Sequence, residues 1–421
     1  MSVVIAPRVL HISLSDYRGG ADIAAYRIYQ SVTQSGVEAR MAVRYSGGTH
    51  TDVTEVPFPR FSHWASHWAR GLAERVQKSS NPFHRSLNLF PTGGMSVPDF
   101  VPNLVHLHWI GSNTLSLQEI QDIPVPVVWT LHDSWPFSGA EHHPSYPTDE
   151  RFVSGYTRAN RVHSSRIDVD GWLWRRKANI WKRCFHLVGP STWISAQAHR
   201  SRLMSNQPVV TIANPLKPAF LQEKSQAEGR ARFGIDSQAF VVVSAGIGGT
   251  GIENKGWYLL RRALSDLGHR GVKTHLVLIG QTGIPDGIPT ETAFTSTGVL
   301  DEPTDVADAL SCGDVFVTTS TIESFGLAAA ESSAVGLPVV APSTSGLLDV
   351  VVDGETGWLV PPGDAEALAN TLQEVRADPS EAKRRGAAGR VRAQRLWSMA
   401  TIGDQYRDLY ESILASRGTD A

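Results

Sequence analysis

The chain has 421 residues, of which 41% are hydrophobic and 19% are charged, and its formal net charge is −2. This length is too great for one ordinary hydrophobic core and predicts two domains. The near-neutral charge predicts no nucleic-acid partner. Two cysteines, Cys184 and Cys312, exclude a disulfide framework and a cysteine-based metal site. A reducing cytoplasm is the simplest setting for such a chain.

The start of the chain and its apolar runs indicate no membrane-spanning or leader segment. No apolar run approaches the roughly 18 residues that span a bilayer. Residues 1–12 lack the pattern of a signal peptide and instead predict a first β-strand. We therefore expect a cytoplasmic protein, with peripheral contact to the inner face of the cell membrane as an open option.

Short apolar, β-branched runs alternate with longer amphipathic stretches, and this alternation runs twice along the chain. The expected strands are Arg8–Ile12, Glu38–Val43, Leu104–His108, Val125–Leu131 and Leu187–Pro190, then Phe240–Ala245, Thr274–Ile279, Ala293–Thr297, Val315–Thr318, Pro338–Ala341 and Gly357–Val360. The expected helices include Ala21–Ser35, Trp172–Cys184, Trp257–Leu267, Pro303–Ser311 and Ala365–Ala377. Near-continuous apolar strands that alternate with helices predict parallel sheets covered on both faces.

Prolines after Asn214 and Lys217 mark a break over Val210–Pro218. We predict two doubly wound α/β domains, residues 1–213 and 214–396, facing each other across a cleft. Ligands are expected at the carboxyl ends of their strands. The tail, residues 397–421, has a helical apolar pattern and is predicted to cross back toward the N-terminal domain.

The strongest functional pattern is Glu323-Ser324-Phe325-Gly326-Leu327, which follows a predicted strand, with Glu331 two helical turns further on. Two carboxylates at this spacing can face one pocket. The free N–H groups at the start of the helix suit a diphosphate or sugar hydroxyls. Glu331 would then hold a ribose diol and Glu323 a donor-sugar hydroxyl. The alternative interpretation is a helix-capping acid followed by a partly solvated glutamate.

Together with Gly336–Ala341, Gly346 and Asp353–Asp364, this pattern resembles the C-terminal lobe of the family-4 retaining glycosyltransferases, whose E-x7-E element Glu323 and Glu331 match. The first half is similar to the N-terminal lobe of that family at Gly19-Gly20-Ala21 and Thr130–Asp133. The segments Leu107–Ile110 and Val128–Gly139 resemble a bacterial subgroup that builds colanic-acid-like exopolysaccharides and lipopolysaccharide. The resemblance implies the GT-B fold, with two Rossmann-like domains that bind acceptor (N-terminal) and nucleotide-sugar donor (C-terminal).

The resemblance also implies roles for single residues. Gly19 and Gly20 would leave room for the nucleotide-sugar, and His132 would hydrogen-bond the donor sugar. Lys255 would neutralise the donor diphosphate as it leaves. Without the resemblance, these residues are a turn, a structural histidine and a solvated lysine. The arginine that the family places before Lys255 is missing from the stretch before it.

The resemblance implies two sets of site residues. The catalytic residues are His132, Lys255 and Glu323, and the donor-binding residues are Gly19, Gly20, Asn214, Ser324, Phe325, Gly326, Leu327 and Glu331. Asn214 has an equally good interpretation as a turn residue. No cofactor and no metal are expected, because Lys255 and helix N-terminal amides can neutralise phosphate charge.

The expected function is retaining transfer of a hexose from a UDP- or GDP-sugar to a saccharide or lipid-linked acceptor, in the synthesis of a bacterial surface polysaccharide. Two alternatives stay open. One is a non-catalytic, sugar-nucleotide-binding partner of a true transferase, which the missing arginine favours. The other is a nucleotide-sugar epimerase or hydrolase on a similar fold.

Two patterns have the form of a metal site. Asp168-Val169-Asp170 resembles a D-x-D metal motif but is expected on the surface, and His106, His108, His142 and His143 lack zinc-site spacing. The stretch His63–Lys78 places Trp64, Trp68 and Leu72 at helical spacing among basic residues. This stretch predicts either a helix that docks on an anionic membrane or an apolar stripe facing the core, and both stay open.

Overall fold

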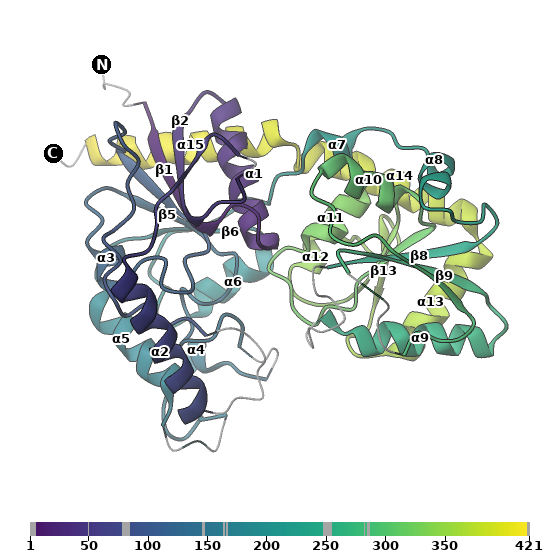
Figure 1. Ribbon diagram of the computed structural model, residues 1–421, viewed down its shortest axis with the longest axis horizontal. Coiled ribbons are helices and arrows are strands. Elements are labelled where there is room, and N and C mark those ends of the chain that lie inside the picture. Colours follow the sequence, from purple (N-terminus) through teal and green to yellow (C-terminus); the bar gives the residue numbers. More distant parts are fainter. Residues whose placement is uncertain are drawn as a thin grey trace. The chain divides into compact units, whose positions relative to one another are not determined.

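The computed structural model describes residues 6–48, 50–77, 85–144, 148–162, 165, 167–246, 255–281, 283 and 287–418. The chain forms two compact units (Figure 1). Unit 1 consists of Met1–Pro215 and Met399–Ala421, and unit 2 consists of Leu216–Ser398. Among the described residues, no helix combines the length and the apolar character needed to cross a membrane.

Unit 1 is built on a parallel sheet of seven strands in the order β3-β2-β1-β4-β5-β6-β7. The strands are β1 (Arg8–Ser15), β2 (Glu38–Tyr45), β3 (Val53–Glu55), β4 (Leu104–Leu107), β5 (Val127–Thr130), β6 (His186–Gly189) and β7 (Val209–Thr211). The helices are α1 (Gly20–Gln34), α2 (Arg60–Val76), α3 (Leu117–Gln121), α4 (Arg151–Ser154), α5 (Val169–Ile180), α6 (Thr192–Arg200) and α15 (Met399–Gly418).

Unit 2 is built on a parallel sheet of six strands in the order β10-β9-β8-β11-β12-β13. The strands are β8 (Phe240–Ala245), β9 (Thr274–Ile279), β10 (Thr292–Ser296), β11 (Val315–Val317), β12 (Val339–Pro342) and β13 (Gly357–Val360). The helices are α7 (Pro218–Leu221), α8 (Gln226–Arg232), α9 (Trp257–His269), α10 (Pro303–Ser311), α11 (Leu327–Ala334), α12 (Leu347–Val350), α13 (Ala365–Ala377) and α14 (Pro379–Leu396).

Both faces of the first sheet are buried. Successive residues of β5 alternate between two cores, with Val127 and Trp129 in one and Val128 in the other. Tyr406 and Tyr410 of α15 complete the second core, and Figure 1 shows α15 lying alongside α1. Burial on both faces explains why the strands read as near-continuous apolar runs. The predicted fold class, two parallel sheets each flanked by helices, is confirmed.

Some predicted element bounds need correction. The break predicted over Val210–Pro218 overlaps β7, and β3 was not predicted at all. Both are three-residue strands at the two edges of the sheet, too short to show periodicity. The helix predicted after Glu323 begins at Leu327, because the preceding Gly326 has a φ of 95°, outside the helical region.

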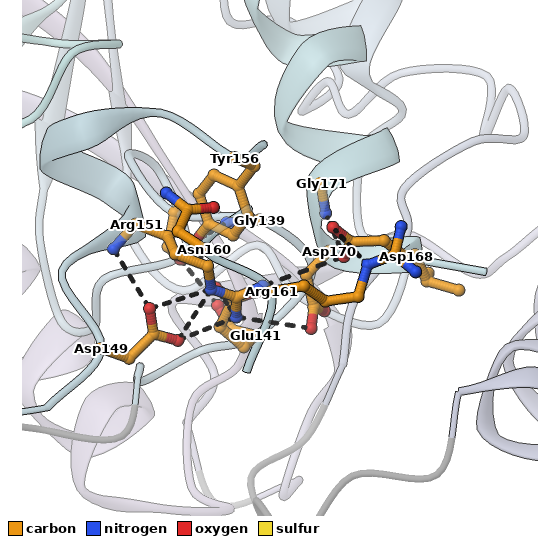
Figure 2. A network of polar contacts seen from close by, with 12 residues as sticks. Gly139, Glu141, Asp149, Arg151, Tyr156, Asn160, Arg161, Asp168, Asp170 and Gly171 are labelled. Carbon is orange, nitrogen blue, oxygen red and sulfur yellow. Dashed lines mark hydrogen bonds and ion pairs between the residues drawn. The ribbon is translucent and has the colours of Figure 1, made fainter. Parts of the chain in front are cut away.

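Arg151 lies at the centre of a buried ionic network in unit 1 (Figure 2). Its Nη2 atom is 2.8 Å from Asp149, and the carboxylates of Glu141, Asp168 and Asp170 lie within 3.8 to 4.0 Å of its guanidinium. The expectation that Asp168 and Asp170 lie on the surface is wrong, since both are buried. Arg151 supplies the charge that makes their burial tolerable, and Asp168 also caps α5 through the Gly171 N–H.

The network predicts that Arg151→Met strongly destabilises the protein, because it removes the cation that pairs with the buried carboxylates of Asp149 and Glu141. We expect the free energy of unfolding to fall by about 3–5 kcal/mol, measured by urea denaturation. The control is Arg200→Met, which breaks an exposed ion pair with Glu150 and should cost less than about 1 kcal/mol. Equal losses in the two variants would contradict the central role of Arg151.

Candidate functional site

A small cavity of about 30 Å³ lies in unit 2 where β8, β9 and β11 end. The ends of these strands and the turns after them supply most of the lining, which consists of Ser244, Ala245, Gly246, Lys255, Trp257, Leu260, Leu278, Ile279, Gln281, Thr318, Thr319 and Ser320. The carboxyl edge of an open parallel sheet is where such folds bind ligands. This cavity is therefore the first candidate site in unit 2.

Lys255 is the one charged residue among the described residues that line this cavity. Its Nζ atom lies 2.6 Å from Oε1 of Glu323, and both side chains are partly exposed, at 33% and 22%. The carbonyl oxygen of Lys255 accepts a hydrogen bond from Thr319 Oγ1 at 2.8 Å. The structure thus brings together two of the predicted catalytic residues. Glu253 and Asn254, which precede Lys255, lie outside the described residues, as does most of the loop from Gly246 to Gly251.

Two glycines allow the backbone segments that carry Lys255 and Glu323 to pack closely against their neighbours. Gly256 follows Lys255 with a φ of 64°, and a Cβ there would lie 2.3 Å from the carbonyl oxygen of Thr319. Gly346 donates its N–H to the carbonyl oxygen of Glu323 at 2.9 Å, and a Cβ on Gly346 would lie within 2.6 Å of the adjoining backbone. Both positions therefore require glycine for the observed close approach.

The rest of the E-x7-E element lies mostly inside unit 2. Phe325 is buried and makes a T-shaped contact with Trp397, with ring centroids 5.6 Å apart. Ser324, Gly326 and Leu327 form the turn into α11. Glu331 is 8% exposed, and it does not line the cavity beside Lys255. The structure therefore joins Glu323 to Lys255 but does not place Glu331 on the same cavity.

In unit 1, His132 lies just after β5 at the end of a chain of histidines. Its Nε2 is 3.2 Å from Nδ1 of His108, and Nε2 of His108 is 2.9 Å from Nδ1 of His11. Burial lowers the pKa of His132 to about 4 and that of His11 to about 3, so all three rings are neutral near pH 7. His11 was not singled out by the sequence, because it faces His108 from a strand 97 residues away.

The protons of these neutral rings can be assigned. The Nε2 atom of His11 is buried without a hydrogen-bond partner among the described residues. An unpaired acceptor is less costly there than an unpaired N–H donor. We therefore assign the proton of His11 to Nδ1, which donates to His108, and that of His108 to its own Nδ1, which donates to His132. Neutral His132 then carries its proton on Nδ1.

A metal is not needed to explain the buried histidines. Nitrogen atoms of His11, His106 and His108 lie within 4.8 Å of one another. However, His106 uses Nδ1 with the Tyr410 hydroxyl at 2.7 Å and Nε2 with Thr130 Oγ1 at 2.8 Å. His108 uses both nitrogens with the other histidines. We interpret the cluster as a hydrogen-bonded core that orients His132.

Asp133, beside His132, has a structural role. It accepts hydrogen bonds from the Trp109 indole at 2.6 Å and from the Trp135 N–H at 2.9 Å, and it pairs with His142. Burial acts to raise the pKa of Asp133, but the interactions with His142, His143 and the Trp135 N–H together outweigh it and hold that pKa below its usual range. His142 is thus part of this clamp and not of a metal site.

The remaining predicted residues also lie in unit 1. Gly19 has extended backbone and precedes α1, and Gly20 is its first residue. A Cβ at either would meet nothing within 4 Å, so the protein itself does not require glycine there. Asn214 is 5% exposed, and its Oδ1 has no hydrogen-bond partner among the described residues. Open space at the glycines and an unpaired buried acceptor are both features that a ligand would explain.

The histidine chain predicts a loss of stability in acid. Between about pH 4 and 6.5 these histidines bind more protons in the unfolded chain than in the native chain, so the stability that they contribute is complete above pH 6.5 and is lost as the pH falls. Urea unfolding at pH 7 and pH 5 should show a lower free energy of unfolding at pH 5. The slope of the free energy of unfolding against pH should be smaller in His11→Asn, by up to about 1.4 kcal/mol per pH unit. The control His269→Asn, on the exposed end of α9, should leave it unchanged; equal slopes in all three proteins would refute the assignment.

Part of the chain is similar in sequence to known glycosyltransferases. Residues 241–378 match the family model described as glycosyl transferases group 1. A GDP-mannose-dependent α-(1-6)-phosphatidylinositol monomannoside mannosyltransferase of Mycolicibacterium smegmatis is 30% identical over 201 residues, which cover 44% of this chain and 51% of that protein. The capsular polysaccharide biosynthesis glycosyltransferase CapM of Staphylococcus aureus is 26% identical over 39% of this chain and 44% of its own length. The chain thus matches about half the length of these curated relatives.

Solved structures match over nearly the whole chain. Sucrose-phosphate synthase of Thermosynechococcus elongatus has a TM-score of 0.68 and 21% identity, covering 97% of this chain and 99% of its own. Anabaena HepE in complex with UDP-glucose has a TM-score of 0.65 and 15% identity, covering 96% and 99%. At such identities the likeness shows the fold alone. Residues 241–378 are therefore similar to the glycosyl transferases group 1 family, within a chain that has the GT-B fold.

Proposed function

We propose that the protein is a retaining glycosyltransferase that moves a hexose from a nucleotide-sugar to a saccharide or lipid-linked acceptor. The observation that carries this proposal is the Lys255–Glu323 pair at the carboxyl edge of the second sheet, inside the segment that matches the family model. We place the reaction in the cytoplasm, in the synthesis of a bacterial surface polysaccharide. The capsular polysaccharide relative CapM supports that setting, as does a structural neighbour, the glycosyltransferase WaaG involved in lipopolysaccharide biosynthesis.

In the proposed reaction, Lys255 binds the donor diphosphate and Glu323 accepts a hydroxyl of the donor sugar. The bond between the sugar C1 and the diphosphate oxygen breaks, and a bond from C1 to the acceptor oxygen forms on the same face. The proton of the acceptor hydroxyl passes to the departing diphosphate. Charge pairing with Lys255 stabilises that leaving group most when its charge is greatest, which is the requirement for catalysis.

The residues of unit 1 complete the proposal. His132, held neutral with a proton on Nδ1, offers a donor to a sugar hydroxyl. The open space at Gly19 and Gly20 leaves room for the nucleotide-sugar, and Asn214 offers its unpaired oxygen to the nucleotide. The GDP-mannose-dependent mannosyltransferase and the HepE structure with bound UDP-glucose support a UDP- or GDP-sugar as the donor.

A thermal-shift panel of UDP-, GDP- and ADP-sugars tests the donor site. A ligand at about 100 times its dissociation constant stabilises the native state by roughly 2.7 kcal/mol, which gives a visible shift. We expect a shift with one nucleotide class in the wild type, reduced in Lys255→Ala and Glu331→Ala. The control is Lys383→Ala on exposed α14, far in sequence from the site, which should keep the shift.

The outcomes separate the proposal from its alternatives. Donor binding with transfer to an acceptor supports the transferase. Donor consumption without any acceptor would indicate an epimerase or hydrolase. Donor binding without turnover would indicate a non-catalytic partner protein, and no shift with any nucleotide would contradict the donor site itself.

Helix α2 supports contact with a membrane. Its large apolar side chains face solvent, with exposed fractions of 73% for Phe61, 64% for Trp64, 62% for Trp68 and 46% for Leu72. The side chains that it buries are small, such as Ala65 and Ala73. The alternative of a core-facing apolar stripe is therefore wrong. We propose that this face docks on an anionic membrane, since exposed tryptophans on a basic helix suit that interface.

Replacing Trp64 and Trp68 by alanine should abolish cosedimentation with vesicles that contain anionic lipid, because the double variant removes the largest exposed apolar area of α2. The matched control is Tyr258→Ala, which removes an exposed aromatic side chain from unit 2 and should leave vesicle binding intact. Circular dichroism would show that both variants are folded. Unchanged cosedimentation of the double variant with these vesicles would contradict the docking proposal.

A further inference from the structure

Unit 1 contains a larger cavity, of about 150 Å³, that the predicted site does not use. It lies between helix α2, the ends of β1 and β2, and the segments 85–90 and 112–113, and we refer to it as the arginine cavity. Its basic lining residues are Arg18, His63, His67, Arg70 and Arg85, and no aspartate or glutamate is among the described residues that line it. A cavity with this lining favours an anion.

The three arginines differ in how far their charge is already compensated. Arg85 is paired with buried Asp170 at 3.3 Å, which fixes it in the wall. Arg70 has Glu74 only at 4.0 Å, and both of these side chains are exposed. Arg18 makes no ion pair among the described residues and instead lies 3.9 Å over the ring of Tyr45. Arg18 and Arg70 are therefore the cations that an incoming anion would meet.

Two further groups near the lining report on its electrostatic field. Burial lowers the pKa of His67, and the positive charge of Arg70 lowers it further, so the charge of Arg70 acts on this wall of the cavity. Behind the cavity, buried Arg44 donates to backbone carbonyl oxygens, including those of Val56 and Thr114, and makes no ion pair among the described residues. The negative charge of Glu119 also acts on this guanidinium, so only part of the positive charge of Arg44 is left to the field behind the cavity.

The walls of the cavity are held rigidly. Asn88, Ser112 and Asn113 line it with positive φ values of 48°, 52° and 62°, which are rare outside glycine. The Asn88 side chain donates to two backbone carbonyl oxygens at 2.7 Å and accepts the N–H of Asn113. Strained backbone that its neighbours enforce is typical of binding sites.

We propose that the arginine cavity binds a phosphate group of the acceptor, an inference that rests on the proposed transferase function. Arginine is suited to phosphate because its planar fork can donate two hydrogen bonds to one oxyanion group. Arg18 has no ion pair among the described residues, and Arg70 has only a distant and exposed one. Two such guanidinium groups match the double charge of a phosphate monoester or diphosphate better than the single charge of a carboxylate. The phosphate can belong to a soluble sugar phosphate or to a lipid-linked sugar.

Isothermal titration with inorganic diphosphate tests the cavity directly. We expect one-to-one binding to the wild type, weakened at least about tenfold in the double variant Arg18→Gln/Arg70→Gln, as loss of charged hydrogen bonds predicts. The matched control is Arg60→Gln/Arg75→Gln, which removes the same charge from exposed positions of α2 that do not line the cavity. It should bind diphosphate like the wild type. Lys255→Ala, measured in parallel, reports any binding at the donor cavity.

A second arm identifies the source of the phosphate. Vesicles of phosphatidylcholine with and without phosphatidic acid are cosedimented with the same proteins. Loss of both diphosphate and phosphatidic-acid binding in Arg18→Gln/Arg70→Gln supports a lipid-linked phosphate, and loss of diphosphate binding alone supports a soluble one. Unchanged diphosphate affinity in Arg18→Gln/Arg70→Gln overturns the proposal. A loss of diphosphate affinity in Arg60→Gln/Arg75→Gln as large as that in Arg18→Gln/Arg70→Gln also overturns it.

Failure of this inference can be told from failure of the proposed function. The nucleotide-sugar shift of the thermal panel depends on the donor cavity in unit 2 and should persist in Arg18→Gln/Arg70→Gln. A retained nucleotide shift with unchanged diphosphate binding refutes the phosphate site alone. A variant-dependent diphosphate affinity in a protein that shifts with no nucleotide refutes the donor site and leaves an anion-binding cavity in unit 1.

Discussion

Parallel strand pairing is the constraint on which the rest of this structure depends. Two parallel neighbours need a crossover connection, which in most cases here contains a helix, and all strands of a parallel sheet end at one edge. In unit 1 this edge carries Arg18 after β1 and His132 after β5. In unit 2 it brings Lys255, after β8, within 2.6 Å of Glu323, after β11. The sites therefore consist of residues that are distant in sequence and share only their place relative to a strand.

Backbone strain marks the same places. Among the described residues, five that are not glycine have a positive φ, and three of these line the arginine cavity. A fourth, Ser345, accepts a hydrogen bond from the N–H of Glu323 at 2.9 Å. Such conformations cost of order 1–3 kcal/mol each and persist only where the surrounding contacts enforce them. Both sites thus have walls fixed before any ligand arrives, which reduces the ordering cost of binding.

The fold could be predicted because buried parallel strands carry their own signal, whereas most of the site could not. The β-branched runs at Phe240–Ala245 and Thr274–Ile279 gave the observed strand bounds, but three-residue edge strands have no periodicity. Lys255 was found only through a family resemblance, since no local pattern shows that it pairs with a carboxylate 68 residues away. Asp170 was assigned wrongly for the same reason, because its burial depends on contacts with Arg151 and Arg85 that the local sequence does not reveal.

The two cavities differ in what an arriving anion must displace. Arg18 has no ion pair among the described residues, so an anion bound there adds a charge interaction without breaking one. Lys255 already has Glu323 as its partner, so a diphosphate must compete with that carboxylate for the same Nζ atom. This competition has a consequence for the proposed reaction. In the proposed reaction, a diphosphate bound at Lys255 takes this cation away from Glu323, whose carboxylate would then accept a donor-sugar hydroxyl. One ligand would then create, with its diphosphate, the binding group for its own sugar.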